Sequence, residues 1–307
     1  MSEWKEYLLD DFIDVVKKTY LPIKGDNFPY IGLEHIEQQT LRLNGVGSSD
    51  AVTSQKFMFS SGDVLFGKLR PYFRKVVQPN FSGVCSTDIW VLKARKGHYQ
   101  NFIKYFVAAS DFIETCNIGE SGTRMPRADW GYLKDTTWLL PSYEEQKAIA
   151  ELLSSLDNKI DFLHRNNKTL EQLAETLFRL WFKEGADDNW DELPLGKVFD
   201  IGIGRTPPRL EKQWFTMNPD DIKWVSIKDM GSGGLYMSTV SEYLTEDAIK
   251  RFNIPIIPKN TVMLSFKMTI GRVAISTERM VSNEAIAHFK QKDKLSPEFL
   301  YLFFEII

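Results

Sequence analysis

The sequence has little of what a disulfide-linked protein or a cysteine- or histidine-based enzyme needs. Its 307 residues include only two cysteines, Cys85 and Cys116, with no CxxC spacing, which excludes a disulfide framework and a cysteine zinc site. The four histidines are scattered and belong to no HExxH motif or catalytic triad signature. We therefore expect reduced thiols in a cytoplasmic protein.

Signals for export, membrane insertion and nucleotide chemistry are also missing. The chain starts MSEWKEYLLDDF, with acids where a signal peptide carries bases, and no apolar run reaches the roughly 18 residues of a membrane span. There is no GxxxxGK[ST] loop and no NPPY-like tetrapeptide, and the glycines of DIGIG (200–204) precede Arg-Thr-Pro-Pro, which favours an extended turn over a cofactor loop. We expect no catalytic, cofactor-binding or metal-binding residue in this chain.

Net charge is small as well, at -3, but it conceals a segregated pattern. Between Val64 and Ser110 there are eight bases and one acid, a net charge of +7, whereas residues 1–63 carry ten acids and six bases. A local basic surface is what phosphate and guanine recognition requires. The small net charge therefore does not exclude a nucleic-acid partner.

The middle of the chain predicts one unusually long helix. Pro141-Ser142 precedes Glu145 in a capping-box arrangement, no Pro or Gly interrupts 142–184, and Gly185 is a natural stop. This predicts a helix of about 40 residues, roughly 60 Å long. Apolar residues recur on it at heptad spacing and form a seam that requires a partner helix. The seam consists of Ile149, Leu153, Leu156, Ile160, Leu163, Asn167, Leu170, Ala174, Leu177 and Trp181. Asn167 either specifies the pairing or is a lapse in the pattern.

The regions on either side of this helix repeat each other. Four ordered segments of the first region, beginning at Trp4, Asn27, Gly62 and His98, match segments of the second at offsets of 186, 194, 198 and 197. Each copy combines short apolar strands with a helix, so we expect an α+β fold of two repeated mixed domains joined by the helix. The expected domains are 1–141, the helix 142–184 and 185–307, with an acidic solvated linker at 183–192. Because Ile307 aligns with Ser110, we expect the second copy to be incomplete and a second spacer helix to be absent.

The repeat places bases in the same hairpin of both copies, which favours contact with duplex DNA over a merely solvated turn, the alternative. The candidate DNA-contacting residues are Lys68, Arg70, Tyr72, Arg74 and Lys75, with Arg124 and Arg127 as a supporting loop, and Arg205, Lys228, Lys267 and Arg272 in the second copy.

The helix LPSYEEQKAIAELLSSLDNKIDFLHRNNKTLEQLAETLFRLWF (140–182), flanked by repeats bearing GDVLFGKLRPYFRKV and TVMLSFKMTIGRVAI, resembles the specificity subunit of type I restriction-modification systems. The resemblance covers essentially the whole chain. It implies two target recognition domains that each read half of a split DNA site, and a helix that sets their spacing and docks methyltransferase subunits and, through them, the restriction subunit. S-adenosylmethionine, ATP and Mg are then expected in those partners and not in this chain.

Two other functions stay open from the residues alone. A coiled-coil adaptor with duplicated protein-binding domains would share the helix and the repeat, but the duplicated basic hairpins speak against it. A stand-alone DNA methyltransferase or nuclease would need a cofactor or metal site, and no motif for one is found. Self-association through the seam from Ile149 to Trp181 is a further hypothesis.

Overall fold

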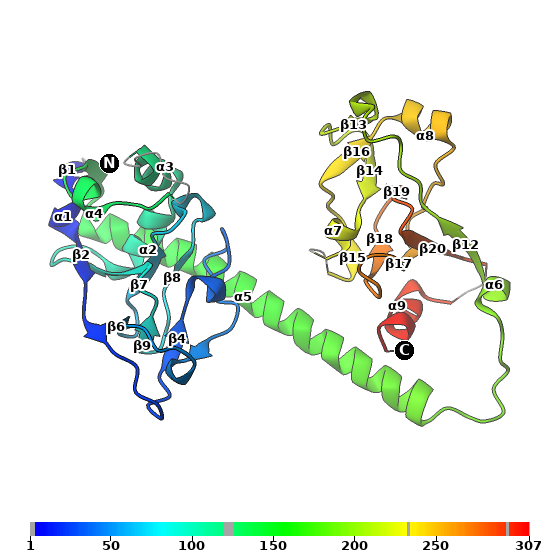
Figure 1. Ribbon diagram of the computed structural model, residues 1–307, viewed down its shortest axis with the longest axis horizontal. Coiled ribbons are helices and arrows are strands. Elements are labelled where there is room, and N and C mark those ends of the chain that lie inside the picture. Colours follow the sequence, from blue (N-terminus) through cyan, green and yellow to red (C-terminus); the bar gives the residue numbers. More distant parts are fainter. Residues whose placement is uncertain (1–3, 119–125, 232–233, 293–294, 307) are drawn as a thin grey trace. The chain divides into compact units, whose positions relative to one another are not determined.

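The computed structural model describes residues 4–118, 126–231, 234–292 and 295–306, and the chain divides into two compact units, Met1–Leu163 and His164–Ile307. The long helix α5 (Tyr143–Arg179) contributes its first half to one unit and its second half to the other. We call the sheet-containing regions before and after α5 the first and the second domain. Figure 1 shows α5 as one continuous helix.

The first domain is built on three sheets, whose strands pair in the orders β1-β11, β2-β10-β7-β8 and β3-β6-β9-β4-β5. The strands are β1 (Lys5–Leu8), β2 (Ile13–Val16), β3 (Thr19–Tyr20), β4 (Pro29–Ile31), β5 (Gly47–Ser48), β6 (Lys56–Phe59), β7 (Val64–Gly67), β8 (Val76–Val77), β9 (Gly83–Cys85), β10 (Ile89–Ala94) and β11 (Thr137–Leu140). The helices are α1 (Leu9–Phe12), η1 (Leu33–His35), η2 (Ser49–Ala51), η3 (Pro71–Phe73), α2 (Gln100–Ala108), α3 (Ser110–Ile118) and α4 (Trp130–Leu133).

The second domain has sheets of the orders β12-β20-β17-β18-β15 and β13-β16-β14-β19. Its strands are β12 (Phe199–Ile203), β13 (Phe215–Thr216), β14 (Ile222–Val225), β15 (Tyr236–Met237), β16 (Glu242–Leu244), β17 (Val262–Ser265), β18 (Val273–Ser276), β19 (Val281–Ser282) and β20 (Ile286–Gln291). Its helices are α6 (Leu195–Val198), η5 (Lys212–Trp214), α7 (Ile227–Met230), α8 (Glu246–Phe252) and α9 (Pro297–Ile306).

The internal repeat is confirmed in the pairing order of one sheet of each domain. The order β2-β10-β7-β8 of the first domain recurs as β12-β20-β17-β18 in the second, with all of the paired strands antiparallel. The parallel pair β4 with β9 of the first domain recurs as β14 with β19, and the second domain adds a further parallel pair, β15 with β18. The predicted α+β class with two repeated mixed domains around a long helix is therefore confirmed.

The sequence of strand β10 is apolar from Ile89 to Leu92 because this part of the strand is buried on both faces. Trp90 and Leu92 face the core that α2 covers, whereas Ile89 and Val91 face a second core shared with the β3-to-β5 sheet. A strand buried on both faces cannot alternate with polar residues. In the second domain β20 does the same, but His288 stands at the place of Val91.

The helix prediction is confirmed in its start and its end. The Glu145 N–H donates to Ser142 Oγ at 3.4 Å, as an N-cap requires, and the Glu145 carboxylate accepts a bond from the Trp4 indole at 3.3 Å. After Arg179 a π-helical turn (Leu180–Glu184) continues the coil, and the Gly185 N–H closes it on the Leu180 carbonyl at 2.9 Å. The acidic linker that follows is exposed to solvent from Gly185 to Leu193.

Candidate nucleic-acid interface

The first candidate site is the hairpin between β7 and β8. After the buried strand Val64–Gly67 the backbone turns through Arg70 and Arg74, which both adopt the left-handed conformation, at φ 52° and 48°. Between them, Pro71 opens the short helix η3 with its fixed φ and is buried. Non-glycine residues in this conformation cost free energy and concentrate at functional turns. This places the Tyr72 ring at the exposed tip.

A second segment, residues 126–128, lies alongside this hairpin. The Arg70 N–H donates to the Pro126 carbonyl at 2.8 Å, the Ala128 N–H donates to the Lys68 carbonyl at 2.9 Å, and Leu69 forms a β-bridge with Arg127. Arg127 is exposed and its guanidinium lies 3.1 Å from the Asp88 carboxylate. Arg124, the other residue predicted here, lies outside the described residues.

The basic side chains of the first hairpin differ in how far they are committed to contacts within the protein. Lys68 is half-buried, and its burial lowers the pKa of its ammonium group. The Arg74 guanidinium donates to Ser110 Oγ at 3.0 Å, and Arg70 lies 5.9 Å from the centre of the Phe73 ring. Lys75 is half-buried and donates to a backbone carbonyl. The tip of the first hairpin is therefore basic, aromatic and packed against its own domain.

The second hairpin, between β17 and β18, has the same frame and a different tip. Met268 (φ 63°) and Gly271 (φ 89°) take the left-handed positions that Arg70 and Arg74 occupy in the first. The buried Ser265 holds the turn, since its hydroxyl donates to the Thr269 carbonyl at 2.6 Å and accepts from the Arg272 N–H at 3.0 Å. Residues 267–271 are all exposed, with Lys267 as the basic group.

Sequence reasoning missed the apolar character of this tip. Met268 is 93% and Ile270 is 78% exposed, among the largest exposures of any apolar side chain in the described chain. The signal was available, because both residues align with the basic hairpin of the first copy. A pattern of charge alone does not mark these two apolar residues.

The other predicted bases of the second domain do not form one cluster. Lys228 is exposed on α7, next to the carbonyl that Arg272 contacts. Arg205 instead closes the end of α8 by donating to the Phe252 and Asn253 carbonyls at 2.7 and 3.2 Å. A hydrogen bond from Thr206 lowers the pKa of Glu284, and the positive charges of Lys267 and Arg209 lower it further. Arg209, from the loop that also carries Arg205, and Lys267, from the hairpin, therefore act on the same carboxylate.

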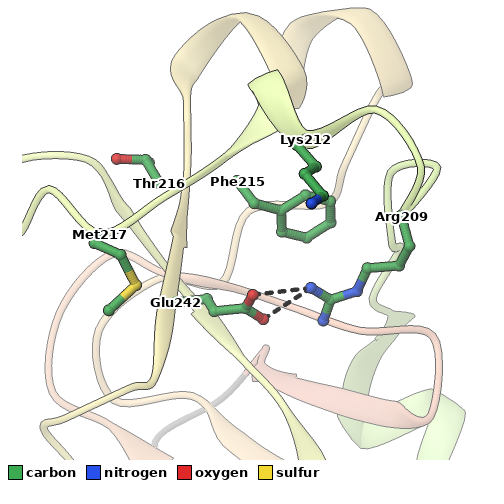
Figure 2. Close-up of a pocket in the computed structure, with 6 residues that line it drawn as sticks. All are labelled: Arg209, Lys212, Phe215, Thr216, Met217 and Glu242. Carbon is green, nitrogen blue, oxygen red and sulfur yellow. Dashed lines mark hydrogen bonds and ion pairs between the residues drawn. The ribbon is translucent and has the colours of Figure 1, made fainter.

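Arg209 lines a surface pocket of about 330 Å³ in the second domain. Figure 2 shows its guanidinium pointing at Glu242, with bonds of 2.8 and 3.0 Å, while Lys212 extends beside the Phe215 ring. The guanidinium also lies 4.2 Å from the centre of the Phe215 ring and 4.4 Å from that of Trp224. The positive charge of Arg209 is thus already paired with Glu242. The pocket is lined by this ion pair, which packs against aromatic rings.

The seam of α5 is half-buried near the two domains, at Ile149, Leu153 and Leu177, and exposed in its middle. Ile149 packs against the core of the first domain, and the ring of Phe178, next to Leu177, lies with its centre 5.0 Å from that of Phe299 of α9. Between them the seam is exposed, with Leu156 at 54% and Leu170 at 61%. The exposed part consists of Leu156, Ile160, Leu163, Asn167 and Leu170, and Trp181 is exposed beyond it, whereas Leu153 and Leu177 are half-buried.

Neither a metal centre nor a membrane helix emerges from the described ranges. In those residues no group of three or more His, Cys, Asp or Glu side chains is placed to hold a metal ion. No helix there is both long and apolar enough to cross a membrane.

Comparison with known proteins now decides the family. The model of the type I restriction modification DNA specificity domain matches residues 1–172 and again 187–307, once for each repeat. The chain belongs to this specificity family. The resemblance predicted from the helix entrance and the hairpins is thereby confirmed.

Relatives within the specificity family are distant but extend along the chain. The HindI specificity subunit of Haemophilus influenzae is 20% identical over 382 residues, which cover 98% of this chain and 82% of that subunit. The EcoDI specificity subunit of Escherichia coli is 25% identical over 223 residues, covering 72% of this chain. In that match the chain spans only 45% of the relative's length. The crystal structure of a type I S subunit from M. genitalium shares the fold, with a TM-score of 0.58 and 16% identity over 99% of this chain and 77% of that one.

Proposed function

We propose that this specificity-family chain is the DNA sequence-recognition subunit of a type I restriction-modification complex, acting in the cytoplasm. Each domain reads one half of a bipartite duplex site, and α5 sets the spacing. The observation that carries the proposal is the duplicated hairpin, which keeps one backbone frame while its tip residues differ. A frame kept constant under divergent tips suits two readers of two different half-sites.

Duplex contact is assigned to basic and aromatic residues of the two hairpins and of the segments beside them. In the first domain these are Arg70, Tyr72 and Arg74, with Lys68, Arg124 and Arg127 in support; in the second they are Lys267, with Lys228 and Arg205 nearby. Arginine in such a position can bond guanine through two N–H groups, and lysine can bond phosphate. The chain itself performs no catalysis in this proposal. S-adenosylmethionine, ATP and Mg act in the methyltransferase and restriction subunits with which it assembles.

The test is to copurify the full chain with its methyltransferase subunit and to map the bases that become methylated. A single split motif, with two defined halves and a fixed gap, is the expected result. Methylation that follows no bipartite motif, or a complex that shows no salt-dependent binding to duplex DNA, contradicts the proposal. The second of these outcomes would favour the adaptor.

A second proposal concerns the bare middle of α5. An apolar stripe of this length on a single helix is stable in water only against a partner, and another copy of this chain supplies an identical seam. Asn167 would then lie at the centre of the pairing. Sedimentation at several concentrations tests this, and we expect reversible dimers that Leu163→Glu with Leu170→Glu abolishes. Lys159→Glu, an exposed change off the seam, should leave the dimer intact; a strictly monomeric wild type contradicts the pairing.

A further inference from the structure

Both domains contain the same contact between a hairpin base and a short helix. In the first, Lys75 Nζ donates to the Leu33 carbonyl at 2.5 Å. In the second, Arg272 Nη1 donates to the Ile227 carbonyl at 2.5 Å. Leu33 and Ile227 hold equivalent positions, since each is the first residue of the short helix (η1 or α7) that follows the matching strand β4 or β14.

The two bases also hold equivalent positions in their hairpins. The Lys75 carbonyl accepts the N–H of Gly67 at 2.8 Å, and the Arg272 carbonyl accepts the N–H of Ser265 at 2.9 Å. Gly67 and Ser265 each end the strand that leads into the turn. The backbone carbonyl of each basic residue therefore accepts the bond that closes the hairpin. Its side chain bonds the hairpin to the neighbouring short helix.

Burial separates these two residues from the exposed part of each tip. Lys75 and Arg272 are half-buried, whereas Tyr72 and Lys267 are exposed. Burial lowers the pKa of Lys75, as expected for an ammonium group partly removed from water. The Arg272 guanidinium lies so close to Gly231, which follows α7, that a β-carbon there would be 2.2 Å from Nη1. Neither cationic group is free to follow a phosphate.

We propose that Lys75 and Arg272 are positioning residues that anchor each hairpin to its neighbouring helix and so fix the tip for DNA, without contacting DNA themselves. The inference rests on the proposed function. It reduces the number of residues proposed to contact the duplex, because Lys75 and Arg272 are no longer among them. One copy uses lysine and the other arginine, which fits a single bond to a carbonyl. A site that grips guanine through two N–H groups would not tolerate this exchange.

Salt dependence distinguishes an anchor from a phosphate contact. Each phosphate contact adds about 0.9 to the slope of log affinity against log salt concentration. We therefore compare the complex of the full chain and its methyltransferase subunits with Lys75→Met and Arg272→Met variants on the mapped site. We expect affinity to fall about tenfold with an unchanged slope. Lys267→Met, a tip change, should lower the slope by about 0.9 and serves as the positive control.

Two further variants keep the positive charge. The variants Lys75→Arg and Arg272→Lys give each copy the residue type that the other uses. They should leave the affinity for DNA within about twofold of wild type, because either group can donate to the carbonyl. Gly231→Ala leaves Arg272 in the sequence but should displace its guanidinium from the Ile227 carbonyl. It should therefore reproduce the loss of affinity expected for Arg272→Met.

Amide hydrogen exchange without DNA guards against a folding defect. In Lys75→Met the amides of β7 and β8 should exchange faster, while those of the second domain stay as in wild type. A slope that falls by about 0.9 in Lys75→Met or Arg272→Met, or unchanged affinity in both, overturns the anchor. A wild-type complex that binds no duplex DNA overturns the proposed function instead, and the exchange data would still report on the anchor.

Discussion

The two hairpins differ at their tips and agree in their frame. Each has a left-handed residue on either side of the turn, and each is closed by one base bonded to the helix beside it. The first presents arginines and Tyr72, and it packs against α3 and the segment 126–128. The second presents Lys267, Met268 and Ile270 to solvent. Conformation here is set by the frame, which leaves the tip residues free to change without loss of the turn.

The comparison also bears on the interpretation of charge. Bases at matching places in two copies suggest a shared surface role. The residues selected on that ground include Lys75 and Arg272 alongside the other bases of both hairpins. Those two residues share instead an internal bond to a carbonyl, while the tips, where a shared role was expected, have little in common. Likeness between the copies indicates what the fold needs, and difference indicates what recognition can vary.

The largest expected effect comes from removing the basic tip of the first hairpin. Arg70→Ala combined with Arg74→Ala should weaken binding of the partnered complex to its site by about 100-fold, since each arginine contact to DNA contributes on the order of 1–3 kcal/mol. Mutating Lys267→Ala, the one base of the second tip, should cost less than the double change. Titration of labelled duplex at moderate salt measures both.

The control for this prediction removes the same charge elsewhere. Arg95→Ala with Lys96→Ala deletes two exposed bases of the first domain outside the hairpin and should change affinity only slightly. Equal losses in the control and the tip variant would mean that general charge, and not the hairpin, attracts DNA. Unchanged affinity in the tip variant would refute the hairpin assignment.

Local patterns were sufficient to predict much of the fold. The N-cap at Ser142, the stop at Gly185 and the heptad spacing are all short-range signals, so α5 was predictable almost to its ends. The strands Val64–Gly67 and Val262–Ser265 followed from apolar runs, and the repeat made each support the other.

What could not be predicted depends on contacts between distant residues. The bond from Lys75 to Leu33 joins residues 42 positions apart, and the bond from Arg272 to Ile227 joins residues 45 positions apart. The sequence match at offset 194 pairs Leu33 with Ile227, but the match at offset 198 pairs Arg74, and not Lys75, with Arg272, so the equivalence of the two bonds needed coordinates. The pairing of Leu69 with Arg127 likewise needed the fold, although a supporting role for that segment had been predicted.

The cores of the two domains also differ, at one position of the central strand. This difference predicts that the stability of the second domain depends on pH. His288 is fully buried at the place of Val91, with Nε2 2.6 Å from Ser282 Oγ and no partner for Nδ1 among the described residues. Burial lowers the pKa of His288 to about 4. Between pH 6.5 and 4 the unfolded chain therefore binds a proton that the folded chain does not, so stability falls with falling pH by at most about 1.4 kcal/mol per pH unit. His288→Val should remove this dependence.

Hydrogen exchange of β20 amides at pH 7 and pH 5.5, corrected for intrinsic rates, measures the effect in the second domain alone. The exposed His164 on α5 offers the matched control, because His164→Ala should leave the pH dependence unchanged. A His288→Val protein that still loses protection in β20 at pH 5.5 as wild type does would show that other groups cause it. The first domain, with Val91 at this place, should vary less.

The smallest effect separates a packed tip from an exposed one. Phe73 is half-buried, with its ring centre 4.7 Å from that of Tyr72, and η3 contacts α3, so Phe73→Ala should cost the first domain about 1–2 kcal/mol. Ile270→Ala removes a side chain that contacts mostly water and should change stability by less than about 0.5 kcal/mol. Urea unfolding of the full chain, followed by exchange in each domain, compares the two. Equal costs would mean that Ile270 is covered in solution, and the contrast between the tips would then be one of sequence only.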